Sequence, residues 1–277
     1  MRRRPGLLLA PALLLTALVV GASTSVLLLQ SLGLMPLVGQ PRLSLDAYRA
    51  VGPDLLASAG LSLALAAVAT TLAAVLGLTT ALLVASTQRG SRILRLVAAA
   101  TVPVPHLVGA AAIGLLLADS GVLPRLLGLS PAQWPDLVAG PWWVAVVAEY
   151  VWKESAFIAL VVSAVVASRL TSYEQTAAVL GASRRYRLLH VTIPLALPAL
   201  VVSSAISFVY VVGSYEVAWL LGRTSPEPLP VLAYRLYSSP DLAARPESAA
   251  VAVVTLAVAG VAAAVALLSV RRARVAA

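Results

Sequence analysis

The sequence contains no cysteine and few charged side chains for its length of 277 residues. Without cysteine, neither thiol catalysis nor a disulfide framework is available to this chain. Charged residues make up 11% of the sequence, whereas they make up about a quarter of a typical soluble domain. Hydrophobic residues account for 60%, and the mean hydropathy is +0.95. These values indicate an integral membrane protein with no segment polar enough to form a separate soluble domain.

Several apolar runs are long enough to cross a bilayer as helices, which requires about 20 residues each. They lie at about 6–29, 55–85, 96–117, 144–166, 195–221 and 249–270. The first run follows three arginines as a signal peptide would, but it is too long for the apolar region of one. We therefore predict a single all-α, polytopic membrane domain over residues 1–277, with six transmembrane helices and a core at about 55–270.

Arginine is distributed unevenly between the two sets of alternate loops. One set contains the groups at 2–4, 89–95, 169–187 and 271–274, whereas acidic residues gather in the opposite set. Positive charge is retained on the cytoplasmic side of a membrane during insertion. We therefore predict a multi-pass membrane protein with both termini and the segment 169–194 in the cytoplasm. The same rule explains the net charge of +9, so lipid is the expected partner and nucleic acid is not.

The segment 169–194 separates two predicted spans and has the signals of a helix, a turn and a second helix. Thr171 and Ser172 can each N-cap the first helix, because Glu or Gln stands three residues later. Gly181 can adopt a positive φ and end that helix, and Ala182-Ser183 can start the next one. The residues expected to dock a cytoplasmic partner are Glu174, Gln175, Thr176, Ala177, Ala178, Gly181, Ala182, Ser183, Arg184 and Pro194. An apolar ridge exposed to water is typical of such a docking surface.

This segment resembles the cytoplasmic coupling loop of type I, binding-protein-dependent ABC importer permeases. The pattern of that loop begins with Glu-Ala-Ala, which is followed by three residues and a glycine. After a spacer, it ends with a hydrophobic residue, then Leu or Ile, then Pro. Gly181 stands at the glycine and Ile193-Pro194 at the end, while Gln175 and Thr176 replace the first two residues of the pattern. Gln175 retains a capping side chain but removes a charge. The resemblance covers about 45–270 and includes the stretches LDAYRAV, PVPHLV and VWKESAFIALVVSAV.

The resemblance implies a transport subunit of the bacterial inner membrane that forms a solute pathway with a second permease subunit, identical or paralogous. The coupling loop of each permease is then expected to sit on a cytoplasmic ATPase subunit, and an extracytoplasmic binding protein is expected to deliver the solute. The chain has no G-x-x-x-x-G-K-[ST] phosphate loop. We therefore expect no enzymatic activity and no cofactor in this chain, with ATP bound by the partner.

Ionisable residues within the predicted spans are the candidates for the solute pathway, because a charge in a bilayer is costly unless it is paired or faces a cavity. Glu149 and Lys153 are four residues apart on one helix face, which favours a self-neutralised pair. The pathway candidates are Glu149, Lys153, Glu154, Gly213, Tyr215 and Glu216. His106 is interpreted as a buried hydrogen-bonding residue rather than a ligand, and no residues have metal-ligand spacing.

The solute is predicted to be a polyamine-like cation, or else another small organic solute or a metal chelate. GSYEVAWLLGR and the connector after it are most similar to permeases of the spermidine/putrescine, iron and thiamine group, and unpaired carboxylates suit a cation. Two other classes of protein stay open. A membrane-embedded enzyme predicts a polar catalytic cluster at one depth, and a secondary transporter often has inverted repeats.

Overall fold

The computed structural model is a bundle of long helices, and it describes residues 5–86 and 90–275. The side chains at 5–8, 85–86, 90–91, 167–172, 174–175, 266 and 269–275 are outside this description. The regular elements in the described part of the chain are all helical, which confirms the all-α class.

Five helices form the body of the bundle. They are α1 (Pro5–Ser31), α3 (Gly52–Ser86), α7 (Val144–Val179), α9 (Ile193–Gly213) and α12 (Arg245–Val275). Shorter helices are α2 (Asp46–Ala50), α4 (Gly90–Thr101), α5 (His106–Leu117), α6 (Val122–Leu126), α8 (Arg184–Arg187), α10 (Glu216–Leu221) and α11 (Leu229–Tyr237). Single turns lie at Pro131–Gln133, Leu188–Thr192 and Leu242–Ala244. Helix α1 packs on α12, α12 on α9, and α9 on both α3 and α7.

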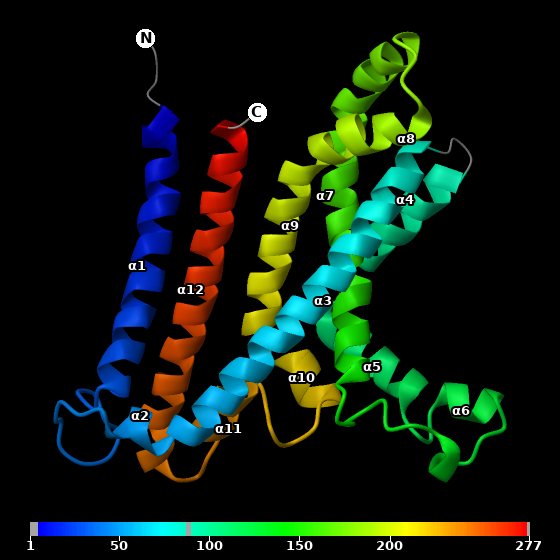
Figure 1. Ribbon diagram of the computed structural model, residues 1–277. Helices are drawn as coiled ribbons and strands as arrows, with labels where there is room; N and C mark the ends of the chain where they lie inside the picture. The colour runs from blue at the N-terminus through cyan, green and yellow to red at the C-terminus, as the bar shows by residue number, and fades with distance from the viewer. Residues whose placement is uncertain (1–4, 87–89, 276–277) are drawn as a thin grey trace.

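The start of α1, the end of α12 and the short helix α8 lie at one end of the bundle (Figure 1). Helices α2, α6, α10 and α11 lie toward the opposite end. The arginine-rich helix α8 therefore shares one end with the start of α1 and the end of α12, as the alternation of loops predicts.

By length and composition, the described residues contain five helical segments able to cross a membrane. They are Leu9–Ser31, Gly52–Val84, His106–Leu126, Arg184–Gly213 and Leu242–Val265. The predicted fourth span lies in α7, which has 36 residues but carries Glu149, Lys153 and Glu154 close together. The count of six spans therefore stays a prediction, whereas the other five runs coincide at least in part with these segments.

Two predicted spans are interrupted rather than continuous. The run 96–117 is divided between α4 and α5, because Pro103 and Pro105 lack the N–H groups that would continue the helix. The run 195–221 is divided between α9 and α10, where Ser214 is extended and Glu216 opens the new helix. An acidic residue favours a helix start because it faces the positive end of the helix dipole.

Small residues of α3 allow close approach of α7. Ala66, Ala69 and Ala73 are fully buried, and Gly77 lies against Ile158 of α7. A Cβ atom at Gly77 would lie 2.7 Å from Ile158 Cγ2, which is closer than real contacts allow. Small-residue interfaces of this kind are typical of packed membrane helices, where close approach increases dispersion contacts.

We expect Gly77→Ala to lower the melting temperature of the purified permease. Its methyl group would lie 2.7 Å from Ile158 Cγ2 and 3.0 Å from the carbonyl oxygen of Ser155, so the helices must separate at a cost of about 1–3 kcal/mol. Gly60→Ala on the same helix is the control, because nothing lies within 4 Å of a Cβ atom there. Equal melting temperatures for the two variants would contradict this account of the α3–α7 interface.

Candidate functional site

The predicted docking segment begins within α7 and not with a separate helix. Helix α7 runs without a break from Val144 to Val179, so the prediction that Thr171 or Ser172 starts a new helix is wrong. The physical reason is that this stretch contains neither glycine nor proline, so nothing stops the transmembrane helix from continuing. Glu174 and Gln175 belong to this helix, but their side chains are outside the described part of the molecule.

Gly181 ends α7 and reverses the chain, as predicted. Its φ is +83°, a region that other residues avoid. The Gly181 N–H donates to the Ala178 carbonyl at 3.0 Å, and the Ala182 N–H donates to the Ala177 carbonyl at 2.9 Å. These paired bonds form a Schellman motif, which satisfies carbonyls left open at a helix end.

Ser183 is the N-cap of the second helix of the segment, which confirms the prediction that this helix starts at Ala182-Ser183. Its side-chain oxygen accepts a hydrogen bond from the Tyr186 N–H at 3.3 Å. The Arg187 guanidinium donates back to the Ala182 carbonyl at 2.9 Å, across the turn. The chain then passes through Leu188–Thr192 into α9, with Pro194 in its first turn. We call residues 176–187 the docking turn.

The docking turn presents apolar side chains that no described residue of this chain covers. Val179 is 88% exposed and Leu180 81% exposed. Tyr186 is 55% exposed and stacks on His190, with ring centroids 4.2 Å apart. The turn projects from the bundle at the end where the termini lie (Figure 1). Its exposure is that of a surface available to a partner.

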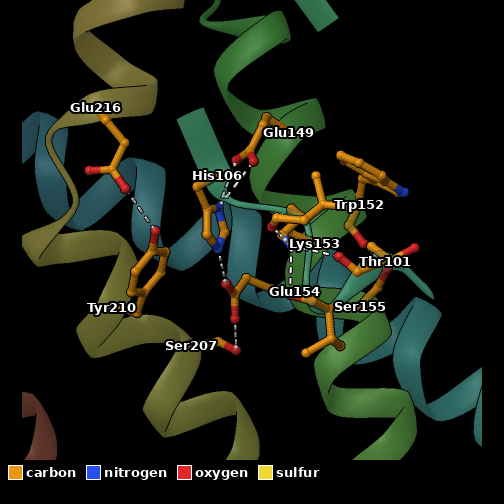
Figure 2. A network of polar contacts seen from close by, with 12 residues as sticks. Thr101, His106, Glu149, Trp152, Lys153, Glu154, Ser155, Ser207, Tyr210 and Glu216 are labelled. Atoms are coloured by element: carbon orange, nitrogen blue, oxygen red, sulfur yellow. Dashed lines mark hydrogen bonds and ion pairs between the residues drawn. The ribbon is translucent and has the colours of Figure 1, made fainter. Parts of the chain in front are cut away.

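A second group of polar residues lies inside the bundle, where α5, α7 and α9 meet (Figure 2). We call His106, Glu149, Lys153 and Glu154 the charge cluster. Glu149, Lys153 and Glu154 are all buried, and the His106 side chain is 18% exposed. The three residues of α7 lie within two turns of helix and therefore at a similar depth in the bundle. Their side chains contact different neighbouring elements.

Lys153 donates hydrogen bonds to backbone carbonyls at the interruption between α4 and α5. Its Nζ donates to the carbonyls of Thr101 at 2.7 Å, Val102 at 3.2 Å and Val104 at 2.5 Å. Carbonyls at the end of a helix have no intrahelical partner and need another donor in a membrane. Among the described side chains, no ion pair joins Lys153 to Glu149, so the predicted self-neutralised pair is not formed. The ammonium group satisfies the prolines' freed carbonyls instead.

His106 lies between the two glutamates of the charge cluster (Figure 2). Its Nδ1 is 3.0 Å from Glu149 Oε1, and its Nε2 is 3.7 Å from Glu154 Oε1. The Ser207 hydroxyl of α9 donates to the second oxygen of Glu154. His106 is thus the hydrogen-bonding residue that the sequence indicates, although it is partly and not fully buried, and its hydrogen-bond partner Glu149 comes from a different helix. The described residues hold no group of three acidic, histidine or cysteine side chains arranged to bind a metal ion.

The remaining pathway candidates lie at the interruption between α9 and α10. Gly213 is the last residue of α9, and Glu216 is the first of α10. Tyr210 donates its hydroxyl to Glu216 Oε1 at 3.2 Å. Tyr215 packs against Tyr234 of α11, with ring centroids 4.6 Å apart. Glu216 therefore has a local partner, which the sequence did not reveal.

Tyr210 connects the two groups of candidates, and the sequence reasoning missed it together with Ser207. The Tyr210 ring also lies 4.6 Å from the imidazole of His106. Ser203, Ser207 and Tyr210 follow one another at spacings of four and three residues on an otherwise apolar helix. This polar stripe, which shares one helix face, was the signal that could have identified both residues.

Comparison with known proteins places this arrangement in a family. Residues 73–274 match the model of the binding-protein-dependent transport system inner membrane component. The match covers most of the chain, including the docking turn and the charge cluster, so the chain belongs to this family. It is therefore a permease component of ABC importers and a multi-pass membrane protein, not an enzyme. A comparison with curated proteins found no match.

Solved structures share the fold over nearly the whole chain. A bacterial ABC transporter involved in the import of the acidic polysaccharide alginate aligns with a TM-score of 0.73 at 18% identity, covering 98% of this chain and 99% of that chain. The alginate transporter in complex with its pentasaccharide-bound periplasmic protein gives 0.71 at 18% identity, covering 96% and 91%. An amino acid ABC transporter with histidines gives 0.61 at 18% identity, covering 83% and 99%.

Proposed function

We propose that this chain forms the solute pathway together with a second permease subunit and couples it to a separate cytoplasmic ATPase through the docking turn. An extracytoplasmic binding protein delivers the solute at the opposite end of the bundle. The observation that carries the proposal is the exposed, glycine-capped turn after α7, within a chain that belongs to the importer permease family.

The orientation follows from charge. The docking turn contains Arg184, Arg185 and Arg187, and it lies at the end of the bundle where the arginine-flanked termini lie. The positive-inside rule places such an end in the cytoplasm. Both termini and the docking turn are therefore proposed to face the ATPase, with six transmembrane helices once the polar helix α7 is counted as a span.

The shape of the docking turn suits a partner that provides an apolar cleft. Val179 and Leu180 are each more than four-fifths exposed at the tip of a long helix, where water would otherwise surround them. Apolar anchors that enter a pocket on the partner contribute most of the binding energy in many interfaces. Arg184 and Arg185 of α8 are exposed and available to acidic groups of the ATPase.

Helix α7 connects the docking turn to the charge cluster without a break in the helix. From Glu154 to Val179 the helix is continuous, which corresponds to about 37 Å at a rise of 1.5 Å per residue. A displacement of the docking turn by the ATPase is thus proposed to move Glu149, Lys153 and Glu154 as one unit. These side chains contact α5, α9 and the interruption before α5, so the motion reaches the pathway helices.

The opposite end of the bundle has a cavity of about 600 Å³ between α10, α11 and the connector between them. Trp219, Tyr234 and the ion pair between Arg235 and Glu227 line it. We propose that this end receives the binding protein and its solute. The shared fold of the alginate transporter, which is known in complex with a periplasmic protein, supports this arrangement.

For the solute, we propose a polyamine-like organic cation. The proposal rests on the similarity of 213–248 to permeases for such solutes, because Glu149, Glu154 and Glu216 all have partners in this chain and do not form an unpaired cation site. Calorimetry of the cognate binding protein with spermidine and putrescine tests it. Binding of a sugar, an anion or a metal chelate in place of these amines would contradict it.

The double variant Val179→Asp/Leu180→Asp tests the docking role. We expect it to insert normally but to lose copurification with its ATPase by more than about tenfold, because two apolar anchors become charged. Leu126→Asp is the matched control, since Leu126 is 76% exposed at the opposite end of the bundle. Retained association of the double variant, or ion-driven uptake by the permease alone, would favour a secondary transporter.

A further inference from the structure

The cavity between α10 and α11 contains an arginine whose hydrogen-bond donors are only partly used by this chain. The Nε of Arg235 donates to Glu227 Oε1 at 2.5 Å, whereas no described residue accepts a hydrogen bond from either of its Nη atoms. Glu227 is 8% exposed, but the side chain of Arg235 is 56% exposed. The buried carboxylate therefore holds one edge of the guanidinium, and the end that carries the two Nη atoms stays available to the cavity.

The charged side chains that line this cavity carry a net positive charge. They are Arg223, Glu227 and Arg235. Glu227 balances one arginine, and no described residue forms an ion pair with Arg223, which is exposed. The planar fork of an arginine binds a carboxylate through two parallel hydrogen bonds. The cavity therefore suits a carboxylate, whereas a cation would be repelled.

We propose that Arg235, supported by Arg223, binds a carboxylate, and that this group is an acidic side chain of the extracytoplasmic binding protein. The inference rests on the proposed function, in which the binding protein docks at this end of the bundle. A cationic solute carries no carboxylate and is repelled by the lining. The binding protein is therefore the source that agrees with both the charge of the cavity and its position.

The aromatic residues of the cavity support a protein partner. Trp219 of α10 is 54% exposed and Tyr234 of α11 is 44% exposed, and both line the cavity beside the arginines. Tryptophan, tyrosine and arginine are the residue types that contribute most to binding at protein–protein interfaces. Because Glu227 already holds Arg235, less side-chain entropy is lost when the partner binds.

Binding of the fluorescently labelled, cognate binding protein to the assembled transporter in lipid nanodiscs tests the role of Arg235. Arg235→Lys retains a cation for Glu227 but lacks the planar fork. We therefore expect an unchanged melting temperature and a Kd raised at least about tenfold. Arg125→Lys is the matched control, because Arg125 of α6 is exposed at the same end of the bundle and its Nε also donates within the chain, to the Gly121 carbonyl. An unchanged Kd for Arg235→Lys would overturn the proposal.

The solute state of the binding protein identifies the source of the carboxylate. If an acidic side chain of the binding protein supplies it, Arg235→Lys weakens the binding of the solute-free and the solute-loaded protein by the same factor. An effect confined to the loaded protein would assign the carboxylate to the solute and overturn the proposal.

Zero-length cross-linking tests the contact directly. Arg223→Lys introduces an amine at the cavity, and a carbodiimide joins an amine only to a carboxylate in contact with it. The natural chain has a single lysine, Lys153, which is buried, so few other side-chain amines can react. We expect a covalent adduct with the binding protein from Arg223→Lys and none from Arg125→Lys. Equal yields from the two variants, or no adduct from either, would overturn the proposal.

The same measurements separate this inference from the proposed function. A wild-type transporter that does not bind its binding protein would overturn both. A wild type that binds, together with an Arg235→Lys variant that binds equally well, would overturn the carboxylate site alone and leave the importer assignment in place.

Discussion

Replacing Gly181 by valine is expected to abolish binding-protein-stimulated ATP hydrolysis while leaving the amount of inserted permease unchanged. Gly181 has a φ of +83°, which costs an ordinary residue about 1–2 kcal/mol and a β-branched residue more. A Cβ atom there meets nothing within 4 Å, so the substitution acts through the backbone alone. The Schellman motif must open, and the apolar anchors Val179 and Leu180 then leave their positions. Hydrolysis by the reconstituted transporter in nanodiscs measures the effect.

Gly39→Val provides a matched control for this variant. Gly39 also has a positive φ, +91°, and also has nothing within 4 Å of a Cβ atom, but it lies in the loop between α1 and α2 at the other end of the bundle. The two variants introduce similar local strain at opposite ends of the bundle, so copurification with the ATPase, which the docking turn alone is proposed to mediate, separates them. If Gly181→Val supported normal stimulation, or if both variants lost copurification with the ATPase equally, the docking turn would not be the coupling element.

Replacing Lys153 by methionine is expected to have the largest effect on folding. The variant removes the donor to three carbonyls at the α4–α5 interruption and leaves Glu149 and Glu154 with one cation fewer. Removing one member of a buried charge network costs about 3–5 kcal/mol, a large part of a membrane protein's stability. The yield of monodisperse protein after detergent extraction, and its melting temperature, should both fall sharply.

Arg125→Met separates this effect from the loss of a cation in general. The Arg125 side chain donates to the Gly121 carbonyl at 2.9 Å, but Arg125 is exposed, so water can replace it. Lys153 is also the single lysine of the sequence, which makes its burial measurable with an amine-reactive reagent. In the folded permease, the reagent should modify Lys153 only after denaturation. Rapid modification of native protein, or a Lys153→Met variant as stable as Arg125→Met, would contradict the network described here.

The docking turn was predictable because its determinants are local. A positive φ at Gly181, a cap at Ser183 and a helix start at Pro194 depend on residues adjacent in the sequence. The prediction of a helix start at Thr171 or Ser172 was wrong because it relied on local capping signals alone. Capping side chains stabilise a helix start where one exists, but they do not interrupt a helix that its neighbours continue.

The interruptions of two spans were harder to predict, since hydropathy measures composition and not backbone continuity. The prolines at 103 and 105 indicated a distortion, whereas Ser214 and Tyr215 carry no comparable signal. The extended Ser214 and the helix start at Glu216 lie where α10 packs on α5 and Tyr215 packs against Tyr234, and such tertiary contacts are not encoded in a local sequence pattern. A span predicted from apolar residues alone therefore appears longer than the helix that the chain forms.

The partners of the intramembrane charges lay outside sequence reasoning for a geometric reason. The four-residue spacing of Glu149 and Lys153 describes two residues on one helix, but both side chains extend toward other helices. Their partners are separated from them by 43 to 52 residues in the sequence. Proline at 103 and 105 creates the acceptors for Lys153, so the two features identified separately in the sequence form one site.

Photo-cross-linking from position 180 tests the central claim most directly. A photo-reactive amino acid replaces Leu180 in the assembled transporter, with Leu126 substituted in the same way as the comparison. The account predicts a covalent adduct with the ATPase from position 180 and none from position 126. An adduct between position 180 and the binding protein, or an ATPase adduct from position 126 alone, would contradict it.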